Sequence, residues 1–198
     1  VDINSPHAAL SRGLRFIYQE INLVQEIDIA RNMFLGTEPI SYKALGIVDQ
    51  KTLYKKAEEY LKRFHIELDP HEMVGNLSVT QQKMVEIARA LVSEAKVLVL
   101  DEPTDVLEDR SRNDLFELIE NLKNDGVGFI YISHRYAEAH DLGDRVTILR
   151  DGRNEGTYNI EDITLDQMIS LMIGREVEKQ YPELPSPGEN ESLRVENL

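Results

Sequence analysis

The stretch VLVLDEPT at residues 97–104 constrains the fold of this chain more than any other part of it. Its four uninterrupted apolar residues are typical of a strand that is buried on both faces of a parallel sheet. Ligands of such sheets bind beyond the carboxyl ends of the strands, and that is where Asp101 and Glu102 follow. Pro103 then ends the strand, because proline has no backbone N–H to donate.

Two adjacent carboxylates at a strand end favour metal or phosphate chemistry. One of them is suited to hold Mg²⁺, which takes oxygen ligands and keeps several waters. The other is then free to orient or deprotonate an attacking water. The alternative interpretation is a solvated Asp-Glu pair at the entrance of a loop, and residues 97–104 alone leave both open.

Composition limits the classes of protein that fit this chain. Its 198 residues, 41% of them hydrophobic, suit one globular domain, or one domain and a fragment. The 36 acidic and 22 basic residues give a net charge of -14, which repels a nucleic-acid backbone, so we expect no nucleic-acid partner. The absence of cysteine excludes disulfides and thiolate metal sites. No apolar run approaches the roughly 20 residues of a membrane span, and we expect a soluble chain without a targeting segment.

The first half of the sequence indicates one strand and then a helical region. Ser5 and Pro6 begin a short helix that Gly13 ends, and a strand is expected over 14–18. Apolar residues then repeat at helical spacing between residues 20 and 93. Three helices are expected there. The first ends at Gly36 and the second follows Asp49. The third begins at Ser78, where Ser78 and Gln81 have the spacing of a capping box.

The second half alternates strands and helices, as a parallel α/β sheet requires. A helix through Leu115 and Leu122 stops at Gly126, and strands are expected over 129–132 and 146–149. The sequence Asp151-Gly152 predicts a tight hairpin turn, and a last helix is expected from Thr164 to about Gly174. Prolines and acidic residues then indicate a linker before a possible strand at 193–198.

These patterns predict four parts of the chain. Residues 1–19 end the first part of an α/β core, and residues 20–93 form a helical subdomain. Residues 94–176 form the catalytic core with its carboxyl-terminal hairpin and helix. Residues 177–198 combine the linker with the start of a second domain.

Three polar points fall at the ends of strands that are expected to share one sheet. They are Gln19, the pair Asp101-Glu102, and His134. A glutamine can ligate a metal or hold a water, and a histidine can contact a terminal phosphate through a charge-assisted hydrogen bond. Taken singly, Gln19 is equally well a polar loop residue, and a strand cap is the alternative interpretation of His134. Their expected convergence is what favours a functional site.

The helix that begins at Ser78 adds a different element. Its first turn carries backbone N–H groups, hydroxyls and the positive end of the helix dipole, which together suit an anion. An ordinary capped helix has the same features, so both interpretations stay open.

The order of these motifs resembles the ATP-binding cassette (ABC) family. The phrases that carry the resemblance are Gln19, LSVTQ at 77–81, LDEPT at 100–104 and ISH at 132–134. A narrower resemblance, to the duplicated ATP-binding subunits of bacterial ribose, galactose and xylose importers, is carried by YQEINLV at 18–24, NMFLG at 32–36, ISHR at 132–135, RVTILRDG at 145–152 and IGRE at 173–176. The fold it implies is an α/β P-loop NTPase-like parallel sheet flanked by helices, with an inserted helical subdomain.

The resemblance implies roles for single residues, with ATP and Mg²⁺ as cofactors. Asp101 would bind Mg²⁺, Glu102 would be the catalytic base, and His134 would contact the γ-phosphate. Gln19 would sense Mg²⁺ and the attacking water and couple the site to a permease.

Such cassettes dimerise head to tail, which implies a second set of residues. Ser78, Thr80 and Gln81 would bind ATP held by the opposite cassette. Asp105 would begin the loop, residues 105–108, that crosses to that partner.

The chain departs from the family pattern in three ways. No G-x-x-x-x-G-K-[ST] phosphate loop occurs in the printed residues, so the chain is expected to begin inside a cassette, incomplete at its amino terminus. The strand of that loop would pair between residues 129–132 and 146–149, and the isolated chain is expected to be inactive. Thr80 stands where glycine is usual, and Asp105-Val106 stands where serine and alanine are usual.

The function implied is ATP hydrolysis that energises import of a monosaccharide across the bacterial inner membrane. The implied partners are a second ABC cassette on the same or a sister chain, a sugar permease membrane subunit near residues 20–36, and, indirectly, a periplasmic sugar-binding protein. The chain would lie peripherally on the cytoplasmic face. Two alternatives are a non-catalytic cassette fragment that acts as an interaction module and a soluble ABC ATPase that acts on DNA or ribosomes. The charge of -14 disfavours the latter.

Overall fold

A computed structural model describes residues 3–42, 46–105, 107 and 109–174 of the chain. The chain separates into two compact units, Val1–Gly143 and Asp144–Leu198. The predicted linker and the strand expected at 193–198 lie outside the described residues, and the predicted division into four parts stays a prediction.

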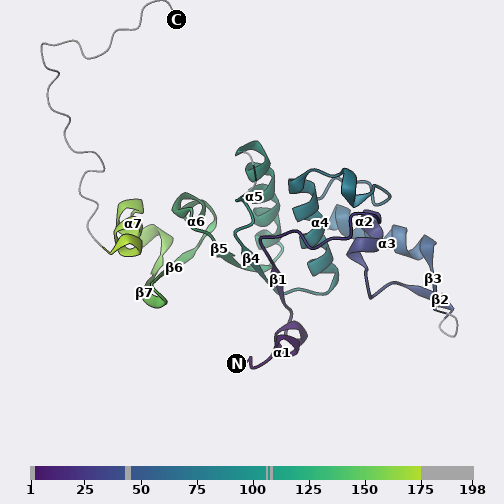
Figure 1. Ribbon diagram of the computed structural model, residues 1–198, viewed down its shortest axis with the longest axis horizontal. Coiled ribbons are helices and arrows are strands. Elements are labelled where there is room, and N and C mark those ends of the chain that lie inside the picture. Colours follow the sequence, from purple (N-terminus) through teal and green to yellow (C-terminus); the bar gives the residue numbers. More distant parts are fainter. Residues whose placement is uncertain (1–2, 43–45, 106, 108, 175–198) are drawn as a thin grey trace, which may run out of the picture. The chain divides into compact units, whose positions relative to one another are not determined.

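The first unit contains a three-stranded parallel sheet in the order β1-β4-β5 (Figure 1). The strands are β1 (Leu14–Ile17), β4 (Val97–Asp101) and β5 (Gly128–Ile132). Phe16 lies opposite Val99, and Val99 lies opposite Ile130. The expected parallel α/β sheet is confirmed, and the carboxyl ends of its three strands lie along one edge.

Helices cover one face of this sheet and make the main core. Leu98 and Leu100 of β4 are fully buried, and they share a hydrophobic cluster with Ile17 and with the apolar stripe of α5 (Asp109–Asn124). Val99, which points to the other face, is only 5% exposed. The prediction that this strand is buried on both faces is therefore confirmed.

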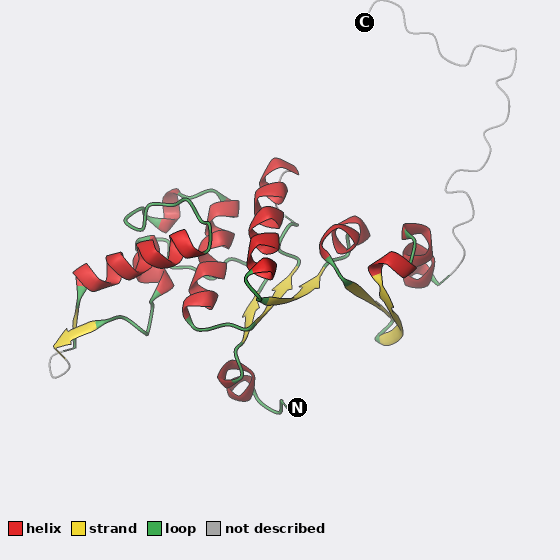
Figure 2. Cartoon of the chain, turned by 180° about the vertical axis from the view of Figure 1, so that it is seen from behind, coloured by secondary structure: helices red, strands yellow, loops and turns green. Residues whose placement is uncertain are grey.

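The helical region packs α2 (Ile29–Met33) and α3 (Gln50–Arg63) against α4 (Val79–Val92). A short 3₁₀ turn, η1 (Val74–Asn76), precedes α4. The sequence predicted helices alone between residues 20 and 93, and this was incomplete. A short antiparallel hairpin of β2 (Ile40–Tyr42) and β3 (Ile47–Val48) extends from the region (Figure 2). All the residues of these two strands but Val48 are exposed, so no periodic burial pattern marks them in the sequence.

Side-chain caps begin the helices where the sequence predicts them. Ser5 caps α1 (Pro6–Ser11), and Asp49 caps α3 by accepting a hydrogen bond from the backbone N–H of Thr52. Ser78 and Gln81 form the expected capping box on α4. Each cap satisfies an N–H group that has no partner inside its helix.

In its described residues, 144–174, the second unit consists of a hairpin, a 3₁₀ turn and an α-helix. Its strands β6 (Arg145–Arg150) and β7 (Arg153–Asn159) pair antiparallel and are followed by η2 (Ile160–Asp162) and α7 (Leu165–Ile173). Asp151 and Gly152 both have positive φ, 48° and 75°, as the predicted tight turn requires. Thr164 caps α7, and the left-handed Gly174 ends it, as expected.

Candidate functional site

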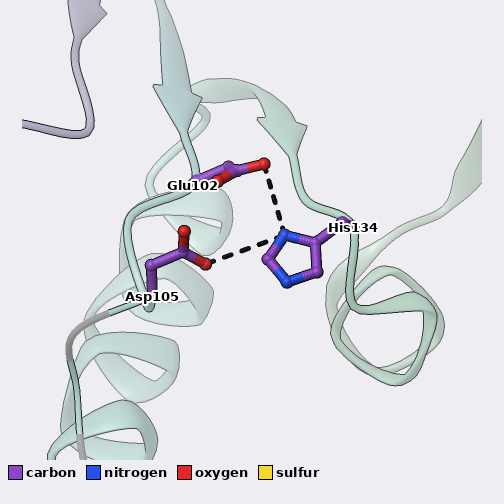
Figure 3. Close-up of side chains that lie close together, drawn as sticks. All are labelled: Glu102, Asp105 and His134. Atoms are coloured by element: carbon purple, nitrogen blue, oxygen red, sulfur yellow. Dashed lines mark hydrogen bonds and ion pairs between the residues drawn. The ribbon is translucent and has the colours of Figure 1, made fainter.

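The carboxyl ends of β4 and β5 bring an acid and a histidine together. Glu102 directly follows β4, and His134 follows β5 by two residues. His134 Nδ1 lies 3.2 Å from Glu102 Oε1 and 3.8 Å from Asp105 Oδ1 (Figure 3). The two carboxylates therefore flank one ring nitrogen of the imidazole.

The backbone of Glu102 holds an unusual conformation that aims its side chain. Its φ is 43°, in the left-handed region that residues with a Cβ rarely adopt. Its N–H nevertheless donates to the carbonyl of Ile132 at 2.9 Å, which ties the turn to the end of β5. Backbone strain of this kind persists only where surrounding contacts fix it, and it clusters at functional sites.

Gln19 joins the same group of side chains from the end of β1. Its Nε2 donates to Asp105 Oδ2 at 2.9 Å, across 86 positions of sequence. Asp105 therefore contacts both Gln19 and His134, through different carboxylate oxygens. The strand ends thus converge as expected, with Asp105 as the bridge.

The site offers ligands for a divalent cation. One ligand atom each from Glu102, Asp105 and His134 lies within 4.8 Å of the others. Asp101, the residue predicted to bind Mg²⁺, is half-buried at the last position of β4, opposite Ile132. Its carboxylate belongs to the class of oxygen ligands that Mg²⁺ prefers.

The residues predicted to act on a partner's nucleotide lie at the start of α4. Ser78 N donates to Gln81 Oε1 at 2.9 Å, and Gln81 N donates to Ser78 Oγ at 3.3 Å. The structure gives these two residues the contacts of an ordinary capped helix. Thr80 is 6% exposed, so its side chain turns inward instead of projecting from the first turn.

Two further residues of α4 were not identified from the sequence. Lys83 and Glu86 are 1% and 4% exposed, and they form an ion pair of 3.0 Å. Lys83 Nζ also donates to the carbonyl of Tyr18 at 2.5 Å, and Glu86 Oε1 accepts from the N–H of Asn22 at 2.6 Å. The pair therefore holds the backbone on both sides of Gln19. An i,i+3 pair of opposite charges normally indicates a solvated helix face, so nothing in the pattern marks this one as buried.

The parallel sheet and the helical region together have the fold of an ATP-binding cassette. The structure superposes on a dimeric ATP-binding cassette in a post-hydrolysis state, bound to ADP and Pi, with a TM-score of 0.61 and 25% identity. The match covers 80% of this chain and 68% of that chain. A second solved structure, a nucleotide-free ATP-binding cassette from an ABC transporter, has a TM-score of 0.68 at 23% identity, covering 91% of this chain and 73% of the other.

A family profile described as ABC transporter matches residues 2–105, just over half of the sequence, and the chain belongs to this family. It is 39% identical, over its whole length, to the ribose import ATP-binding protein RbsA of Geobacillus kaustophilus. It spans 40% of that relative. None of the helices in the described part of the chain combines the length and apolarity needed to cross a membrane.

Proposed function

We propose that this chain supplies the metal-binding and water-activating half of an ATPase site that powers sugar import. The observation that carries the proposal is the contact network of Gln19, Asp105, His134 and Glu102 at one sheet edge of an ABC-family fold. The ribose import relative supports sugar import as the process that is powered.

Each side chain of the network has a definite task in this proposal. Asp101 would hold Mg²⁺, which supplies positive charge beside the phosphates. Glu102 would accept the proton of the attacking water, and His134 would donate a hydrogen bond to the terminal phosphate. The side-chain amide of Gln19 would hold Asp105, so that a conformational change at the site would be transmitted to residues 20–36.

The contact between His134 and Glu102 adds one requirement to this mechanism. His134 Nδ1 is within hydrogen-bond distance of Glu102 Oε1. In the proposed mechanism a carboxylate oxygen of Glu102 must accept the proton of the attacking water. We infer that the imidazole turns toward phosphate when nucleotide binds and leaves Glu102 free to act as a base. The 60% exposure of the His134 side chain gives the ring room for this movement.

A second cassette would complete the site. Ser78, Thr80 and Gln81 would contact nucleotide held by that cassette, and Asp105 would lie at the crossing loop. Thr80 is the position of interest because glycine is usual there, and its burial supports a helix start that stays open to an anion.

The 198-residue polypeptide by itself should bind Mg-ATP weakly. No phosphate loop of the G-x-x-x-x-G-K-[ST] kind is among its residues, and backbone N–H groups of such a loop carry most contacts to the phosphates. Calorimetric titration of this polypeptide measures the affinity directly. Tight binding would contradict the proposal that it holds only half of the site.

We place the permease contact on residues 20–36. Fully buried Asn32 bonds both the N–H and the carbonyl of Val24, each at 2.9 Å, and so fixes the loop that exposes Val24. Leu35 is 50% exposed close by in sequence. Val24→Ser with Leu35→Ser should weaken capture of the permease subunit, whereas Tyr42→Ser, on the hairpin, should leave it intact. The chain would then lie on the cytoplasmic face of the membrane.

Glu102→Gln in the reconstituted transporter tests the central claim. The amide keeps the size of the side chain but cannot accept the proton, so ATP hydrolysis should fall by about 10²–10⁴-fold. Sugar uptake into vesicles should fall with it. Glu161→Gln, an exposed acid of η2, is the control and should retain both activities.

Unchanged hydrolysis in Glu102→Gln would favour the second candidate, a non-catalytic cassette that serves as an interaction module. Thr80 in place of the usual glycine is the observation that favours that candidate. The strongly acidic net charge of -14 continues to disfavour a cassette that acts on DNA or ribosomes.

A further inference from the structure

Glu138, on α6 (Tyr136–Leu142), is a buried acid that the proposed function does not use. It is 3% exposed, and three hydroxyl groups surround its carboxylate. Thr104 Oγ1 lies 2.9 and 2.8 Å from its two oxygens, Tyr131 donates at 2.9 Å, and Ser133 donates at 3.0 Å. Arg135 Nη1 adds an ion pair of 3.5 Å.

The groups around Glu138 keep its charge buried and satisfied. Burial, together with the adjacent Glu138 carboxylate, raises the pKa of Tyr131, so the phenol remains a donor. Thr104 is itself 1% exposed and has the carboxylate as its close partner. A buried carboxylate is costly unless donors compensate it, and this one has a full set.

The donors come from both loops of the candidate site. Thr104 lies two residues after Glu102 and directly before Asp105, and Ser133 lies directly before His134. Ser133 Oγ also accepts from the N–H of Arg135 at 2.9 Å, which shapes the turn on the other side of His134. One carboxylate thus fixes each loop at a position next to a residue of the network.

We propose that Glu138 is a positioning residue that sets the spacing between the loop of Glu102 and Asp105 and the loop of His134. It does not touch the reacting groups. Its meaning for hydrolysis rests on the proposed function, but its effect on geometry does not. The backbone bond from Glu102 to Ile132 joins the same loops at the sheet edge, and Glu138 joins them on the helix side.

The test measures the contact between Glu102 and His134 without nucleotide. In the full 198-residue chain labelled with ¹⁵N-histidine, Glu102→Gln should move the Nδ1 resonance of His134, which His134→Asn identifies among the five histidines. In the Glu138→Gln background, Glu102→Gln should change the chemical shift of His134 Nδ1 by less than half as much. Asp141→Asn, an exposed acid on the same helix, is the matched control and should retain the full movement.

A milder pair of variants keeps the test decisive if Glu138→Gln does not fold. Thr104→Val removes the donor from the first loop and preserves shape, and Tyr131→Phe removes a donor that belongs to β5. Thr104→Val should reduce the movement more than Tyr131→Phe. A full movement of the His134 resonance in Glu138→Gln would overturn the inference. If that variant does not fold, a full movement in Thr104→Val would overturn it, as would no movement in the original background. Loss of ATPase activity alone bears on the proposed function and not on this geometry.

Discussion

Glu102 combines a chemical task with a backbone conformation that suits another residue better. Asparagine tolerates the left-handed region more readily than glutamate, because its short side chain bonds the local backbone. Glu102→Asn should therefore raise the free energy of unfolding by roughly 0.5–1 kcal/mol while removing the proposed base. Chemical denaturation measures the first effect, and ATP hydrolysis in the assembled transporter measures the second.

Glu94 provides the control for this prediction. It also has positive φ, 56°, but it is exposed beyond the end of α4. Glu94→Asn should gain stability without loss of hydrolysis. If Glu102→Asn destabilised the chain while Glu94→Asn stabilised it, contacts of the Glu102 side chain would outweigh its backbone strain.

At the scale of elements, the buried pair of α4 holds the segment that carries Gln19. Glu86→Gln leaves the Lys83 ammonium buried without its countercharge, so the free energy of unfolding should fall by about 3–5 kcal/mol. Urea denaturation measures the loss. Glu59→Gln breaks an exposed pair with Lys55 on α3 and should cost far less. Equal losses in the two variants would argue against an ionised, buried pair.

The cap of α3 should make this helix sensitive to acid. Hydrogen bonds from the side chain and backbone of Thr52 hold the pKa of Asp49 below its usual value of 3.8. A carboxyl group with a lowered pKa in the folded state contributes stability above its unfolded pKa, and that contribution is lost as the pH falls through the folded value.

Asp49→Asn isolates this contribution, because asparagine caps helices about equally well and does not titrate. The thermal midpoint of the original chain relative to the variant should stay constant near neutral pH and decline below about pH 4. Calorimetry at a series of pH values measures the difference. A difference that does not change with pH would contradict a role for the ionised cap.

At the scale of the whole molecule, the sheet has an exposed apolar stripe on the face opposite the main core. Phe16 and Ile130 are 50% and 51% exposed, and they lie in register on either side of Val99. Such a stripe, next to a strand at the edge of a sheet, favours association.

The 198-residue chain should therefore self-associate as its concentration rises. Phe16→Thr with Ile130→Thr should reduce the association constant at least tenfold in sedimentation velocity, since threonine keeps strand propensity but removes apolar surface. Tyr42→Thr, at an exposed site on β2, is the control. A chain that stays monomeric at all concentrations would contradict this use of the stripe.

Local sequence patterns were enough to predict most of the secondary-structure elements and the ends of the strands. Alternating apolar runs, capping residues and the Asp151-Gly152 turn act over a few neighbouring positions, so their pattern predicts strands, helix starts and the hairpin without reference to the rest of the chain. It also placed Gln19, Glu102 and His134 at strand ends, and parallel pairing then brings those ends to one edge.

Which side chains contact one another, and which charged groups are buried, depends instead on how distant elements pack. Asp105 contacts both Gln19 and His134. Lys83 and Glu86 form a buried ion pair. Glu138 accepts hydrogen bonds from hydroxyl groups of two loops. Burial and contact depend on which faces of distant elements pack together, and a charged residue has the same local pattern whether it is solvated or enclosed. The convergence of the strand ends was therefore predictable, whereas the contacts that hold the site in place were not.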